Sequence, residues 1–130
     1  MYIFEDLEAW KSARELRIFV SELVKRFPAE EKYKLTDQAL RSSRGVTNQI
    51  AEGFGRYHYQ ENIQYCRQAR GSLCETLDHM IVAYDEEYIN DKILSDFRIM
   101  YEKTLKLLNG YINYLNKAKK NNHLNNSVTK

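Results

Sequence analysis

The chain has 130 residues, which corresponds to one domain that is large enough for a hydrophobic core. Hydrophobic residues make up 43% of it and charged residues 29%, and its 5 Gly and 1 Pro are too few for the turns of a many-stranded protein, so we expect long helices. No apolar run reaches the roughly 20 residues of a membrane span, the N-terminus lacks the pattern of a signal peptide, and Cys66 and Cys74 suit a reducing compartment, so we expect a cytoplasmic protein without membrane contact.

Apolar residues recur at spacings of three and four, which predicts four helices. The first extends from Leu7 towards Pro28, with Asp6 as its N-cap. The second covers about 35–54 and ends at Gly53 and Gly55, because glycine accepts the left-handed conformation of a helix C-cap.

The third helix follows the apolar positions from Ile63 to Tyr84, and the fourth begins after Asn90 as its cap and reaches Leu115. Short connections make neighbouring helices antiparallel, so we predict an all-α, up-down-up-down four-helix bundle over residues 1–120. Residues 121–130 are Asn-rich and lack aromatic side chains, which predicts a disordered tail.

This geometry predicts a bundle with one basic, aromatic end and one acidic end. The acidic end carries Glu30, Glu31 and the run 85–87. The candidate nucleic-acid-binding residues at the basic end are Arg56, Tyr57, His58, Tyr59, Lys117, Lys119 and Lys120. Lysines and tyrosines can contact phosphates and stack on bases. The alternative is that these charges are solvated and complement helix dipoles.

Residue types that carry chemistry are sparse and scattered, so we predict no catalytic site, no metal and no cofactor. Cys66 and Cys74 are too far apart for a metal clip of the Cys-x-x-Cys kind and are interpreted as packing residues. Glu75 and His79 share a helical face, but a di-iron bundle needs a second such pair, which the chain lacks.

Charged residues also flank the small residues of the second and third helices. We expect Glu52 and Arg70 to form a partly buried pair that fixes helix register, within a network that includes Arg67. The functional alternative is an acid and a cation that await a ligand.

The fourth helix has a second apolar stripe at a spacing of seven, formed by Ile93, Met100, Leu107 and Tyr114. The stripe is either part of a broad core face or a subunit interface in a homo-oligomer.

Several sequence blocks resemble the four helix bundle protein family, also called the 23S rRNA intervening sequence protein family. They are Phe4-Glu5-Asp6-Leu7-Glu8-Ala9-Trp10, Phe27-Pro28, Tyr33-Lys34-Leu35-Thr36, Ile50-Ala51-Glu52-Gly53-Phe54-Gly55-Arg56 and Ala69-Arg70-Gly71-Ser72-Leu73. The chain departs from that pattern at Thr47 and Gln49, where relatives often carry Pro and Asn.

The resemblance implies a bundle that assembles as a ring, a pentamer, without enzymatic activity. Some relatives are encoded within intervening sequences of large-subunit rRNA genes, and a related bundle assists the reverse transcriptase of diversity-generating retroelements. The partners thus implied are further copies of the chain, RNA or DNA, and a nucleic-acid enzyme. A protein-binding scaffold and an enzyme with an unrecognised site are the alternatives.

Overall fold

Four long helices form the molecule. The computed structural model describes the backbone of residues 2–129 and the side chains of residues 2–122. The long helices are α1 (Glu8–Leu23), α2 (Leu35–Gly55), α3 (Tyr59–Asp85) and α4 (Asp91–Thr129), and the short 3-10 helices are η1 (Phe4–Asp6), η2 (Val24–Arg26) and η3 (Ala29–Glu31). This confirms the all-α, four-helix prediction.

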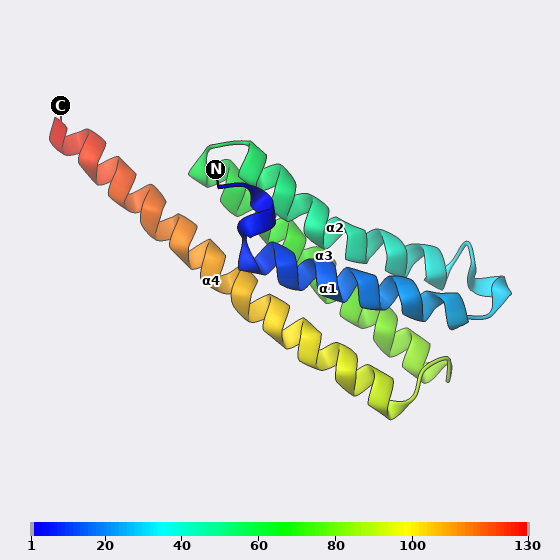
Figure 1. Cartoon of the computed structure of the whole chain (residues 1–130). Helices are drawn as coiled ribbons and strands as arrows, with labels where there is room; N and C mark the ends of the chain where they lie inside the picture. Colours follow the sequence, from blue (N-terminus) through cyan, green and yellow to red (C-terminus); the bar gives the residue numbers. More distant parts are fainter. Residues whose placement is uncertain (1, 130) are drawn as a thin grey trace.

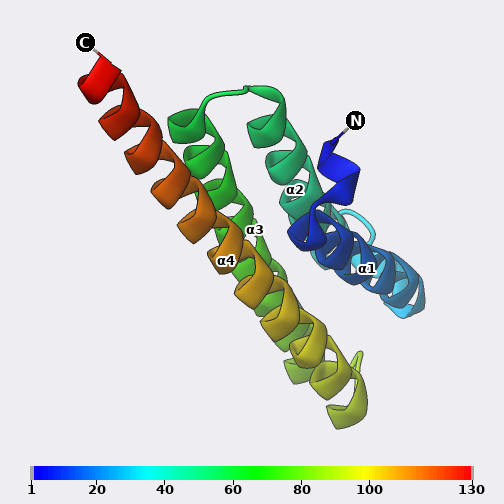
Figure 2. The ribbon, with the colours of Figure 1, turned by 60° about the vertical axis from the view of Figure 1, so that its left-hand side comes forward.

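Each long helix packs against two others, so that the contacts run in a ring from α1 to α2, α3, α4 and back to α1. Successive helices run in opposite directions (Figure 1). Figure 2 shows that the α2–α3 turn lies at the same end of the bundle as the N-terminal segment. The chain direction inferred from short connections is therefore correct.

Buried hydroxyl groups tie neighbouring helices together inside the apolar core. Ser12 of α1 shares a 2.7 Å hydrogen bond with Thr104 of α4. Thr76 of α3 donates to Ser42 of α2 over 2.8 Å. Because a buried hydroxyl without a partner is costly, each pair favours one register between its two helices.

The helix ends match the sequence prediction in part. The Ile93 backbone N–H donates to the Asn90 side chain over 2.9 Å, which confirms Asn90 as a cap of α4. Asp6 instead accepts from the Ile3 backbone N–H within the N-terminal segment, and α1 begins at Glu8 without a side-chain cap. The Asp6 prediction was wrong because a separate 3-10 turn precedes α1.

The backbone of α4 extends to Thr129, through the polar segment that composition predicts to be disordered. The side chains of residues 123–130 lie outside the described part of the chain, so the prediction for the tail stays a prediction.

Gly53 lets α2 and α3 approach closely. A Cβ atom built at Gly53 would lie 2.8 Å from Tyr65 Cβ and 2.8 Å from Asn62 Oδ1, both on α3. Gly71, in the middle of α3, faces open space instead. Both glycines are inside helices, but a side chain at Gly53 would collide with α3, whereas a side chain at Gly71 would meet no neighbour.

Alanine substitutions at these glycines should therefore have opposite effects. We expect Gly53→Ala to lower the free energy of unfolding by about 1–3 kcal/mol, because the helices must move apart. Gly71→Ala should raise it by about 0.5–1 kcal/mol through helix propensity. Urea denaturation measures both changes, and equal stabilities of the two variants would contradict the close approach.

Candidate functional site

An aromatic groove of about 400 Å³ lies at the end of the bundle that holds the α2–α3 turn. Its walls come from the N-terminal segment, that turn, the start of α3 and the second half of α4. The groove is lined by Tyr2, Phe54, Tyr57, His58, Tyr59, Asn62, Tyr111, Tyr114 and Leu115. Three predicted site residues, Tyr57, His58 and Tyr59, thus meet in one concave surface.

Sequence reasoning missed the other half of the groove. Tyr2, Phe54, Asn62 and Tyr111 were not predicted as site residues, and Tyr114 was assigned to an oligomer interface. The antiparallel order of the helices could have indicated these residues. It brings Tyr2 and the stretch after Tyr111 to the same end of the bundle as the α2–α3 turn.

Tyr57 adopts an unusual backbone conformation at the lip of the groove. Its φ is 58°, in the left-handed region that favours glycine and asparagine. Neither Gly53 nor Gly55 has a positive φ, so the predicted left-handed glycine C-cap was wrong. The last residue of α2 is Gly55, and the left-handed residue is Tyr57, two positions later. The Tyr57 side chain is 85% exposed, so its packing does not explain a tyrosine at this strained position.

A hydrogen-bonded set connects the floor of the groove, where Asn62 is buried and Tyr111 partly buried, to the buried Cys66 below it. Asn62 Nδ2 donates to the Tyr111 hydroxyl over 3.0 Å, and Cys66 Sγ donates to Asn62 Oδ1 over 3.5 Å. Burial raises the pKa of Tyr111 to about 12 and the pKa of the Cys66 thiol to about 12. Both groups are therefore uncharged at neutral pH.

The guanidinium of Arg56 contacts three neighbouring side chains, although it is partly exposed to solvent. Its Nη2 donates to the Tyr65 hydroxyl over 2.8 Å and lies 3.1 Å from Glu52 Oε1. Its Nε lies 3.9 Å from Glu61 Oε2. The hydrogen bond to Tyr65 raises the pKa of Arg56. Two carboxylates thus offset much of the charge that the sequence prediction assigned to phosphate binding.

The lysines of α4 lie next to this turn, as predicted. Lys119 donates to the side chain of Gln60 at the start of α3. Among the side chains of residues 2–122, no carboxylate forms an ion pair with Lys117, Lys119 or Lys120. A second groove of about 460 Å³ runs along α4 and is lined by both Tyr114 and Lys117, so it adjoins the aromatic groove at Tyr114.

The predicted Glu52–Arg70 pair is not formed. Glu52 pairs with Arg56 one turn further along α2, and Arg70 Nη1 donates to Asn109 Oδ1 of α4 over 2.8 Å. Arg67 is exposed. The prediction was wrong because Arg70 lies on the side of α3 that faces α4, whereas Glu52 lies on the solvent side of α2.

The second apolar stripe of α4 is used mainly within the chain. Ile93, Met100 and Leu107 are partly buried against the core, as the broad-core alternative expects. Tyr114 is 55% exposed and lines the aromatic groove. A role of this stripe in oligomerisation stays a prediction.

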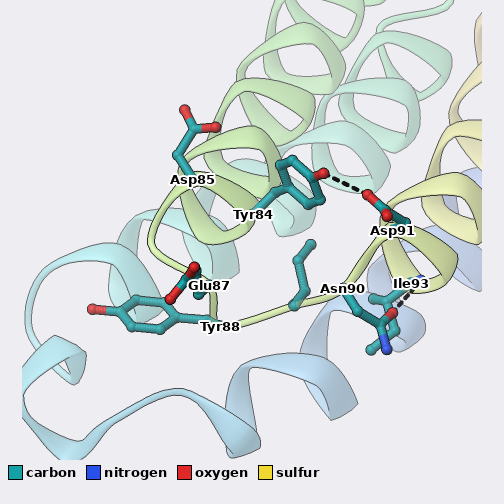
Figure 3. A pocket seen from close by; sticks show the side chains of 8 residues that line it. Tyr84, Asp85, Glu87, Tyr88, Asn90, Asp91 and Ile93 are labelled. Atoms are coloured by element: carbon teal, nitrogen blue, oxygen red, sulfur yellow. Dashed lines mark hydrogen bonds between the residues drawn. The ribbon is translucent and has the colours of Figure 1, made fainter.

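The opposite end of the bundle holds the predicted acidic residues, but η2 and the segment before α2 bring basic side chains to the same end: Lys25, Arg26, Lys32 and Lys34. A groove of about 680 Å³ there is lined by Tyr84, Asp85, Glu87, Tyr88, Asp91 and their neighbours. Figure 3 shows the hydrogen bond that Tyr84 donates to Asp91, and this bond raises the pKa of the Tyr84 phenol. Across residues 2–122, no three His, Cys, Asp or Glu side chains gather as metal ligands.

Comparison with known families matches residues 5–110 to the 23S rRNA-intervening sequence protein family. The chain belongs to this family. The sequence resemblance is therefore confirmed, and the matched range includes the α2–α3 turn but ends before Tyr111, Tyr114 and the lysines of α4. No curated protein matches the chain.

None of the helices, over the described residues, is long and apolar enough to cross a membrane.

The buried thiol and phenol below the groove predict a loss of stability at high pH. Their ordinary pKa values are 9.0 for Cys66 and 10.0 for Tyr111, and the folded state raises both to about 12. The folded protein therefore keeps protons that the unfolded chain releases, so the free energy of unfolding should fall from pH 9 towards pH 12. Urea titrations across this window should show a shallower fall for Tyr111→Phe and for Cys66→Ala.

Tyr114→Phe removes an exposed hydroxyl from the same helix and is the matched control for the pH measurement. A wild-type stability that stays constant across the window would mean that Cys66 and Tyr111 are open to water in the folded protein.

Proposed function

We propose that this protein is a non-enzymatic, oligomeric bundle that binds RNA or DNA at the end with the aromatic groove, alone or together with a nucleic-acid-processing enzyme. The observation that carries the proposal is that the aromatic groove adjoins, at Tyr114, a second groove lined by Lys117 of α4. Aromatic faces and cations on one surface are the two components of sequence-independent nucleic-acid binding.

The charge distribution supports this end of the bundle over the other. Lys117 and Lys120 are exposed and carry no ion pair with any described side chain, so their charge is available to phosphates. At the far end, the carboxylates of Glu30, Glu86 and Glu87 offset basic residues of the same end: Lys25, Arg26, Lys32 and Lys34. A polyanion would therefore meet a less compensated positive charge at the groove end, on the lysines of α4.

Burial disfavours the Cys66 thiol as a nucleophile, whereas Cys74, which the sequence analysis interpreted as a packing residue, is exposed. A thiol acts as a nucleophile through its thiolate, and burial raises the pKa of Cys66 to about 12. At neutral pH this thiol is protonated and works as a packing residue.

Assembly into a ring would strengthen weak sites. Each bundle offers few phosphate contacts, whereas repetition of the same surface around a ring lets one strand engage several sites at once. A ring-shaped homo-oligomer, such as the pentamer that the family resemblance implies, is therefore part of the proposal.

A protein-binding scaffold is the second candidate, because exposed apolar side chains favour protein contacts. Ile18 of α1 is 47% exposed and Ile99 of α4 is 65% exposed. In our proposal, both side chains belong to the interface between subunits of the homo-oligomer. In the alternative, they belong to the binding surface for a different protein.

The proposed function predicts binding that falls with added salt. Fluorescence anisotropy with labelled RNA and DNA should show affinity that drops steeply between about 50 and 200 mM salt. The double variant Lys117→Glu and Lys120→Glu should bind more weakly, and its salt dependence should be shallower by about 1 for each phosphate that is no longer neutralised.

The double variant Lys32→Glu and Lys34→Glu is the matched control, because it makes the same charge change on two exposed lysines at the opposite end of the bundle, beside η3. It should leave the affinity nearly unchanged. If the wild-type protein shows no salt-sensitive binding to either nucleic acid, the scaffold candidate replaces the proposal.

Oligomerisation is tested separately by sedimentation. We expect a species several times heavier than the 15.5 kDa chain at micromolar concentration. Ile18→Lys and Ile99→Lys should dissociate it while each bundle stays folded, because both side chains are already exposed. Ala13→Lys could not test the interface, because Ala13 is buried and a lysine there would unfold the bundle itself. A stable monomer would refute the ring.

A further inference from the structure

Tyr57 carries a large aromatic ring at a position where the fold gains little from one. Its left-handed φ of 58° is costly for any residue other than glycine, and less costly for asparagine than for tyrosine. Its ring is 85% exposed, so little apolar area is buried in return. Glu87, just after α3, has a similar φ of 63°, so this conformation accompanies a helix end in both turns, and the exposed aromatic ring is what distinguishes Tyr57.

We propose that the aromatic groove accepts an unpaired nucleobase, so that the protein prefers single-stranded nucleic acid to a duplex. The inference rests on the proposed nucleic-acid binding and specifies its substrate class. The base would stack on the ring of Tyr57, the exposed tyrosine of the turn, within the groove that Tyr114 of α4 also lines.

Two pairs of rings prepare the groove for stacking. Tyr57 lies 6.4 Å from Phe54 between ring centroids, and Tyr114 lies 6.2 Å from Tyr111 in an edge-to-face arrangement. In each pair the inner ring is partly buried against the core and supports the exposed one. Rings that are already oriented lose less conformational entropy when a base binds.

The groove also offers a polar contact at its floor. The Tyr111 hydroxyl accepts from Asn62, which leaves its own O–H as a donor to a base edge. The volume of about 400 Å³ lies at the lower end of the roughly 300–1,000 Å³ range of small-molecule pockets, which suits a single base.

Charge complementarity gives the path of the strand. The second groove continues from Tyr114 along α4 past Asn113 to Lys117, so phosphates next to an inserted base would meet a lysine. In a duplex, neighbouring bases stack on one another and cover their own faces. The tyrosine rings of the groove then have no base face on which to stack. An unstacked base is therefore the occupant that uses both grooves together.

The test compares Tyr57→Asn with the matched control Tyr33→Asn. Tyr33 is 83% exposed near η3, at the opposite end of the bundle, so both variants remove an exposed tyrosine. Asparagine is better suited than tyrosine to a left-handed φ, so Tyr57→Asn should not lower the urea midpoint. Loss of binding without loss of stability then reports on the ring.

The probes are labelled single-stranded oligonucleotides of RNA and DNA, a duplex of the same sequence, and a single strand with several abasic sites. Wild-type protein should bind the intact single strand at least about tenfold more tightly than the duplex or the abasic strand, as expected for a stacked base. Tyr57→Asn should lose most of that preference, and Tyr33→Asn should keep it.

Equal wild-type affinity for all probes, still sensitive to salt, would overturn the inference and leave the proposed function intact. A preference for the intact single strand that survives in Tyr57→Asn would refute the role of Tyr57 in stacking. Absence of salt-sensitive binding to every probe would refute the proposed function itself.

Discussion

The close approach of α2 and α3 at Gly53 is the constraint on which the rest of this end of the bundle depends. With no side chain at Gly53, the helix backbones come near enough for Asn62 and Tyr65 to pack directly against α2. Tyr65 then meets Arg56 beyond the end of α2, and Asn62 reaches the Tyr111 hydroxyl on α4. The absence of a side chain at Gly53 therefore allows two sets of contacts, one with the residue after α2 and one with α4. The floor of the aromatic groove is built on those contacts.

Stability and binding make different demands on the floor and the lip of the groove. Its floor is linked by internal hydrogen bonds among uncharged groups, which favours rigidity and leaves the Tyr111 O–H as a donor. Its lip carries Tyr57 in a strained conformation and lysines without described ion-pair partners, which favours contact with something outside the bundle. Arg56 lies between these two environments, since its charge is already shared with Glu52 and Glu61. The rigid part is thus the support, and the exposed part is the surface that a ligand would meet.

The sequence predicts the helices and their directions well because both follow from local rules. Apolar spacing identifies the buried faces, Asn90 caps α4, and short connections force antiparallel neighbours, which brings the α2–α3 turn to the end of the bundle that holds the N-terminal segment. The groove itself could be predicted only in part, because Tyr2, Phe54 and Tyr111 are distant in sequence and meet only in the folded chain. The error over Glu52 and Arg70 has the same origin, since sequence spacing fixes which residues share a helix but not which neighbour each side of α3 faces.

The α4 side of the groove follows from the packing of that helix rather than from the turn. Ile112 and Leu115 are buried, and their spacing of three fixes the rotation of α4 about its axis. Tyr111 and Tyr114, each one residue before a buried position, are then directed to the same edge of the core and meet edge to face. Lys117 follows Tyr114 after another three residues and so continues the same face of the helix. The matched family range ends at residue 110, so these three residues lie beyond it, in a part of α4 that Ile112 and Leu115 position against the core.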